Sequence, residues 1–151
     1  MTACVSLSYG CARKGLPASS SFQRWVGAAL AVAEREAGEV SIRITDEAEA
    51  AALNRDYRGK AYATNVLSFP ADLPPGTGSD LLGDLALCAA VIEREALAQG
   101  KLLQAHYAHL TVHGVLHLIG FNHEEPSEAD AMEALEIEAL ERLGIASPYE
   151  P

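Results

Sequence analysis

The chain of 151 residues has few of the features that mark membrane or secreted proteins. It contains no window of 18 apolar residues, so no membrane-spanning helix is expected. Its three cysteines are odd in number and form no Cys-x2-Cys pair, which indicates reduced thiols in a cytoplasmic protein. No basic segment followed by an apolar run opens the chain, so no signal peptide is expected.

Positive charge is also scarce. The 11 Lys and Arg residues face 21 Asp and Glu residues, a net charge of −10 that argues against a protein that coats nucleic acid. Most of the excess of acidic side chains lies near the C-terminus, because residues 124–150 carry nine acidic side chains and one basic one. The rest of the chain is nearly balanced, with 12 acids and 10 bases, so a nucleic-acid substrate is compatible with that part.

Hydrophobic periodicity predicts an α+β fold in a single domain over residues 1–151, with a small mixed four-stranded sheet packed by about five helices. Alternating patterns predict strands at 5–9, 40–45, 65–69 and 81–88. Helical patterns occupy 22–38, 47–57, 89–99, 101–119 and a C-terminal segment. Asp46 and Ser127 are predicted N-caps, with Glu49 at the capping-box position after Asp46.

All five histidines fall between residues 106 and 123, and three form the frame His113-x3-His117-x5-His123. Residues four apart share one helix face, about 5–6 Å apart at Cβ, and Gly120 offers a helix end from which His123 can return. Three imidazoles suit Zn²⁺ and leave a fourth position free for water. The frame therefore predicts one catalytic-type zinc ion per chain on a long central helix.

The other two histidines carry a weaker signal. For His106 and His109 we favour histidines packed in the core and donating to a carbonyl. His109 lies one turn before His113, and its alternative role is to orient the metal site.

The histidine frame also matches the long zincin motif of metallopeptidases at every position but one. Gly114 stands where that motif requires a glutamate as general base. Loss of such a base commonly costs about 10²–10⁴-fold in rate. A zinc metallopeptidase is therefore a minor alternative.

Residues 53–70 gather basic, aromatic and amide side chains. Such groups suit phosphodiesters and unpaired bases. The members are Arg55, Arg58, Lys60, Tyr57, Tyr62, Asn65 and Ser68. From composition alone, a solvated helix end with half-buried tyrosines is the favoured interpretation, and the helix dipole also explains arginines there.

Four blocks together resemble the YbeY family of bacterial rRNA-maturation endoribonucleases. They are Tyr57-Arg-Gly-Lys60, Thr64-Asn-Val-Leu-Ser-Phe-Pro70, Leu82-Gly-Asp84 and His113-Gly-x-Leu-His-Leu-x-Gly-x-x-His123, in family order. The resemblance implies a zinc-dependent, single-strand-specific endoribonuclease in 16S rRNA 3′-end maturation and ribosome quality control. It implies single-stranded pre-16S rRNA and the ribosome or its small subunit as partners, with neither DNA nor membrane.

By the same resemblance, His113, His117 and His123 would hold zinc. Arg58 would stabilise charge on the scissile phosphate, a role that suits a planar, permanently charged donor. The predicted substrate contacts are Arg55, Lys60, Asn65 and Ser68.

Two positions depart from the family pattern. Asn122 stands where an aspartate is usual, and Ala61 where an acid is usual. A carboxylate role at either position would be absent or would fall to another group, such as Glu124. The alternative from a different functional class is a ribosome-biogenesis binding factor whose zinc is structural.

Overall fold

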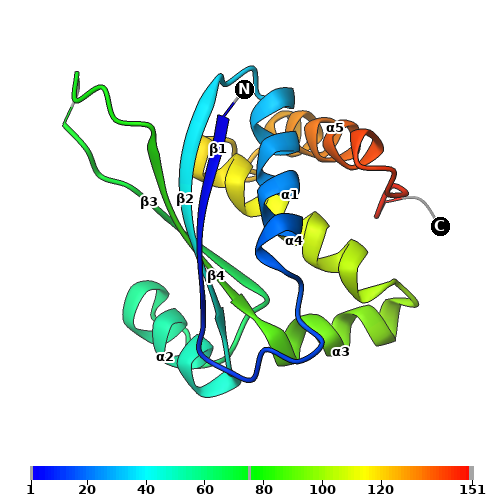
Figure 1. The fold of residues 1–151 in the computed structure, drawn as a ribbon. Coiled ribbons are helices and arrows are strands. Elements are labelled where there is room, and N and C mark those ends of the chain that lie inside the picture. Colours follow the sequence, from blue (N-terminus) through cyan, green and yellow to red (C-terminus); the bar gives the residue numbers. More distant parts are fainter. Residues whose placement is uncertain (1, 75, 150–151) are drawn as a thin grey trace.

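The computed structural model describes residues 2–74 and 76–149. These residues form one four-stranded sheet and five helices (Figure 1). The elements in chain order are β1 (Thr2–Tyr9), α1 (Ser19–Val32), β2 (Ala37–Thr45), α2 (Glu47–Arg58), β3 (Val66–Pro70), β4 (Leu81–Cys88), α3 (Ala89–Gln99), α4 (Leu103–Ile119) and α5 (Pro126–Arg142). The strand order is β1-β2-β4-β3, with β1, β2 and β4 parallel and β3 antiparallel to β4. The α+β prediction with a mixed four-stranded sheet is confirmed.

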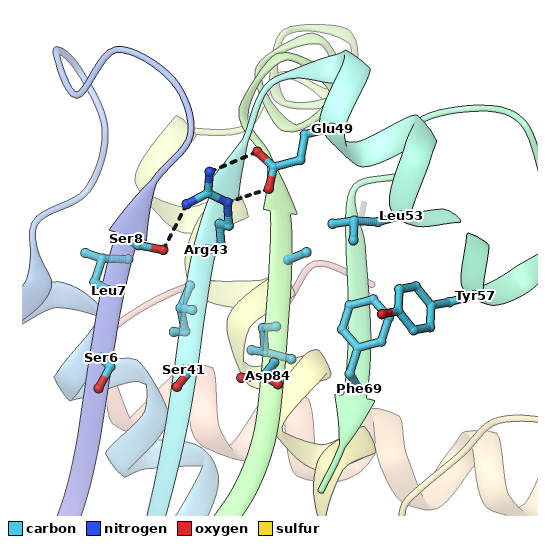
Figure 2. A pocket seen from close by; sticks show the side chains of 13 residues that line it. Ser6, Leu7, Ser8, Ser41, Arg43, Glu49, Leu53, Tyr57, Phe69 and Asp84 are labelled. Carbon is cyan, nitrogen blue, oxygen red and sulfur yellow. Dashed lines mark hydrogen bonds and ion pairs between the residues drawn. The ribbon is translucent and has the colours of Figure 1, made fainter. Parts of the chain in front are cut away.

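The strands alternate between two faces, as their sequences predict. On β2, the buried Val40, Ile42 and Ile44 alternate with Glu39, Ser41 and Arg43. Helices α1, α4 and α5 pack together on the apolar face (Figure 1). Helix α2 lies on the opposite side, where its Leu53 and Tyr57 approach the sheet (Figure 2).

Helix α4 is the central element of the core. Its Tyr107, Val112, Val115 and Leu116 are fully buried. Gly114 packs closely against the sheet, because a Cβ built there would lie 2.7 Å from a methyl group of Leu85. A glycine therefore lets α4 sit directly against β3 and β4.

Several helix boundaries differ from the prediction, and two of them have a clear physical reason. Helix α1 ends at Val32 and Gly38 belongs to β2, where a Cβ would come within 2.8 Å of Leu30 and 2.9 Å of Leu82. Gly38 therefore packs closely against two leucine side chains and does not end the helix. The N-cap of α5 is Glu125, followed by Pro126, so the prediction of Ser127 was wrong.

The N-cap of α2 was predicted correctly. The Asp46 Oδ1 atom accepts a hydrogen bond of 2.8 Å from the backbone N–H of Glu49. The Glu49 side chain does not close the capping box, because it forms an ion pair with Arg43 of β2. Within residues 2–74 and 76–149, no helix has both the length and the apolar character needed to cross a membrane.

Candidate functional site

Four histidines form a row along one face of α4. His106, His109, His113 and His117 follow one another at spacings of three, four and four residues, with successive ring centroids 6.3, 6.3 and 4.6 Å apart. This is the spacing at which helix residues become surface neighbours. The row begins at the buried His106 and ends at His117 in the last turn of α4.

The fifth histidine returns to this row after the helix ends. Gly120 adopts a φ of 122° and its N–H bonds to the carbonyl oxygens of Leu116 and His117. A positive φ of this kind strains any residue with a Cβ. The turn brings the His123 ring to 5.7 Å from His113 and 5.2 Å from His117, centroid to centroid.

The three histidines of the predicted frame could hold one metal ion. Each offers a nitrogen atom, and the three atoms lie within 4.8 Å of one another. The Nε2 atoms of His113 and His117 are 3.1 Å apart. Tetrahedral zinc with ligands at 2.0–2.1 Å separates them by about 3.3 Å, so this pair already has the required spacing.

The protonation state of His117 also suits a metal ligand. Burial lowers the pKa of His117, and the neighbouring His113 and His123 lower it further, to about 4. His117 is therefore neutral at pH 7, as a metal ligand must be.

A buried carboxylate contacts this group of histidines. Glu136 of α5 is 1% exposed, and its Oε2 atom is 3.1 Å from Nδ1 of His113. Its Oε1 atom is 2.7 Å from Nε2 of His109 and accepts a 2.7 Å hydrogen bond from the Tyr149 hydroxyl. Burial acts to raise the pKa of Glu136, but the hydrogen bonds from His109 and His113 outweigh it and lower the pKa to about 2.

Sequence reasoning missed both Glu136 and Tyr149. One signal was available: Glu136 stands four residues from Met132 and four from Leu140, in the apolar stripe of α5. An acid in such a stripe is rarely buried without a partner. Tyr149 had no comparable signal.

His106 is a packed core histidine, as predicted, but its partner is an acid and not a carbonyl. Its Nε2 atom lies 2.9 Å from the Glu95 carboxylate, and burial lowers its pKa. His109 shares the Glu136 carboxylate with His113, which is a contact that the orienting role requires. That role stays a prediction.

A cleft of about 470 Å³ opens beside His113, His117 and His123. One wall comes from the end of α2 and from β3, and the other from the end of α4 and the turn after it. The lining residues are Arg58, Thr64, Asn65, Val66, Ser68, Pro70, His113, His117, Asn122, His123 and Glu124.

Arg58 enters this cleft from the C-terminal end of α2. Gly59 closes the helix in the left-handed region at φ 69°. The buried Asn54 fixes the following turn, because its amide donates to the carbonyl of Tyr62 over 2.8 Å. Among the described residues, Arg58 has no ion pair, so its guanidinium is available to an anion.

The four predicted substrate contacts are placed differently. Asn65 and Ser68 line the cleft, whereas Arg55 and Lys60 do not. Arg55 is exposed and pairs with Asp56 at 3.2 Å. All four stay predictions, but the structure brings only Asn65 and Ser68 together with Arg58 and the histidines.

Asn65 and Ser68 also have partners within the protein. The Asn65 amide donates to Glu95 over 3.0 and 3.3 Å, and its Oδ1 atom accepts from the N–H of Val66. The Ser68 hydroxyl is 3.4 Å from the carbonyl oxygen of Gly114. These contacts tie the start of β3 to α3 and its middle to α4.

One of the two departures noted in the sequence, Asn122, makes a local contact. Asn122 accepts a 3.3 Å hydrogen bond from the N–H of Glu124 and so shapes the turn that carries His123. Glu124 lines the cleft, so one carboxylate is available there. At Gly114, the position of the missing zincin base, a side chain would meet Leu85 and Val66 and would face the sheet.

A second hollow of about 510 Å³ lies on the other face of the sheet (Figure 2). Tyr57 is 68% exposed there and stands edge-on to Phe69, with ring centroids 5.0 Å apart. Among the described residues that line this hollow, Arg43 is the one with a positive charge, and it forms an ion pair with Glu49. Asp84 adds a negative charge. This charge balance does not suit a polyanion.

Comparison with known proteins places the chain among its relatives. The family model described as "Endoribonuclease YbeY" matches residues 13–144. Proteins with that name from Stenotrophomonas maltophilia and Xanthomonas campestris pv. campestris are 60% and 58% identical over 149 residues, which cover 96% of this chain and 92% of each relative.

A solution structure of a Thermotoga maritima protein is similar in fold. It has a TM-score of 0.60 and 20% identity, over 97% of this chain and 99% of that one. At this identity the likeness concerns the fold alone.

Proposed function

This chain belongs to the YbeY family, and we propose that it is a zinc-dependent endoribonuclease that cleaves single-stranded RNA. The observation that carries the proposal is the placement of three converging histidines and the guanidinium of Arg58 in one cleft. The names of the relatives support RNA as the substrate. We further propose pre-16S rRNA as that substrate, the small ribosomal subunit as the partner, and the cytoplasm as the location.

The residues of the cleft have complementary tasks. A zinc ion held by His113, His117 and His123 would supply Lewis-acid polarisation of a phosphate oxygen. The Arg58 guanidinium can donate to the remaining phosphate oxygens as negative charge develops on them. Asn65 and Ser68 stand on the wall formed by β3, where they would orient the backbone of the substrate strand.

The site geometry does not favour the other two candidate functions. A structural zinc is usually enclosed by four protein ligands. Here three histidines lie at an open cleft, with His123 exposed. A peptidase of the zincin type needs a base at position 114, where this chain has a glycine and where a side chain would meet Leu85 and Val66 of the sheet.

The test is cleavage of a labelled single-stranded RNA by metal-loaded protein. Arg58→Ala should lower the rate by about 10²–10³-fold, the usual cost of removing one donor to developing charge. Arg58→Lys should restore only part of the rate, because a lysine cannot donate in bidentate geometry. Metal content should be unchanged in both variants.

Arg94→Ala is the matched control, because Arg94 is exposed, pairs with Glu47 and lies outside the cleft. Its rate should equal that of the wild type. If Arg58→Ala cuts RNA at the wild-type rate, Arg58 has no part in the reaction. If metal-loaded wild type never cuts RNA, the endoribonuclease proposal fails. Analysis of the cleaved ends identifies the nucleophile, because a 2′,3′-cyclic phosphate requires attack by the substrate's own 2′-hydroxyl.

A further inference from the structure

The C-terminal segment reaches back to the histidine row. After α5, Gly144 adopts a φ of 75° and the N–H of Ile145 bonds to the carbonyl of Leu140, which reverses the chain. Tyr149 then lies against His109 with ring centroids 5.6 Å apart, and its hydroxyl donates to Glu136. Tyr149 therefore contacts Glu136. Among the described residues, Glu136 is the only acid within hydrogen-bond distance of a histidine of the predicted metal site.

Glu136 makes these contacts inside the protein. Its carboxylate receives three donors: Nδ1 of His113 at 3.1 Å, Nε2 of His109 at 2.7 Å and the hydroxyl of Tyr149 at 2.7 Å. Because it is 1% exposed, solvent does not compete for its oxygen atoms. A buried carboxylate with three donors is held in one position.

The contact with His113 decides which nitrogen of that ring is free. A carboxylate can only accept a hydrogen bond, so the proton of neutral His113 must lie on Nδ1. The lone pair of His113 is then on Nε2, the atom that lies 3.1 Å from Nε2 of His117. The same reasoning places the proton of neutral His109 on Nε2, and its buried Nδ1 has no partner among the described residues.

The geometry points to Glu136 as a positioning residue for the metal site, and to Tyr149 as the group that holds Glu136 in place. Glu136 fixes the ring orientation and the tautomer of His113, so that Nε2 is presented to the metal before the metal arrives. Helix α5 and the chain end thereby contribute to metal affinity without supplying a ligand. This inference rests on the proposed metal site, and it names two residues that the histidine motif does not include.

The first test measures zinc affinity by competition with a chromophoric chelator. Glu136→Gln keeps the size of the side chain but cannot accept from both histidines at once, so zinc should bind about 10–100-fold more weakly. Tyr149→Phe removes one hydrogen bond from the carboxylate, and the loss should be smaller, about 2–10-fold. Glu138→Gln is the matched control on the same helix, because Glu138 is exposed and pairs with Arg142; its affinity should equal that of the wild type.

The second test needs no variant. Long-range ¹H–¹⁵N spectra of metal-free wild type near neutral pH report the tautomer of each histidine, and His113 should carry its proton on Nδ1.

A purely structural role for Glu136 would lower the melting temperature of Glu136→Gln but would leave the zinc affinity of the folded protein unchanged.

The outcomes separate this inference from the proposed function. If wild type binds zinc and both variants bind it equally well, the positioning role is wrong while the metal site stands. If the His113 proton lies on Nε2, the role is wrong as well. If Glu136→Gln does not fold, Tyr149→Phe and the wild-type spectrum decide the question. If wild type binds no zinc, the metal site and this inference fail together.

Discussion

Gly114 gives the sharpest prediction about how the site is built. A methyl group added there would lie 2.7 and 3.1 Å from the two methyl carbons of Leu85, and 3.4 Å from Val66. Overpacking of this kind typically costs about 1–3 kcal/mol. Alanine also gains about 1 kcal/mol over glycine from helix propensity, so Gly114→Ala should change stability by between about 0 and −2 kcal/mol.

Gly27 in α1 provides the control for the propensity part. It is also within a helix, but a Cβ there meets no atom within 4 Å. Gly27→Ala should therefore stabilise the protein by about 0.5–1 kcal/mol. The difference between the two variants isolates the steric part, about 1–3 kcal/mol in favour of Gly27→Ala.

The measurement is equilibrium unfolding of metal-free protein in denaturant. Trp25 is the single tryptophan of the chain and is 3% exposed, so its fluorescence reports the loss of the core. In thermal melts the two variants should differ by roughly 2–12 °C, at 2–4 °C per kcal/mol for a chain of this size. If Gly114→Ala proves as stable as Gly27→Ala, α4 does not need the close approach to β4, and our account of the helix position is wrong.

Three further predictions concern the turn after α4, the start of β3 and the metal. Gly120→Ala places a Cβ at a φ of 122° and should destabilise the protein by about 1–3 kcal/mol. It should also weaken zinc binding, because His123 follows this turn. A variant with wild-type stability and wild-type zinc affinity would contradict this prediction. Asn65→Ala removes two hydrogen bonds to Glu95 and should lower the free energy of unfolding by about 1–3 kcal/mol. If Asn65 served only as a substrate contact, the substitution would raise KM and leave the stability unchanged. Zinc at 100 times its Kd should raise the unfolding free energy by about 2.7 kcal/mol, and a titration with no thermal shift would argue against a folded-state site.

Local patterns were sufficient for most of the fold and for the metal cluster. The strands and helices follow from the periodicity of apolar residues, because one face of each element is buried. The spacing of His113 and His117 placed them together, because four residues span about one helical turn. Gly120 identified the end of α4 and the return of His123 for a similar reason.

The errors and omissions share a physical cause. Gly38 looked like a helix end, but it is glycine because Leu30 and Leu82 pack against it. Asn65 stays a predicted substrate contact, but its bond to Glu95 of α3 could not be read from its neighbours in the chain. Each case depends on a partner that is distant in sequence.

The residue order alone specified which imidazoles converge, because a helix and one glycine turn are short-range structures with known geometry. The partner of those imidazoles depended on packing, because α5 must fold against α4 before Glu136 can meet His113. The same holds for Arg58, which shares a cleft with the histidines only because α2 and β3 flank the end of α4. The spacing of these histidines is thus a local property of this chain, whereas the charge and orientation around them arise from contacts between distant segments.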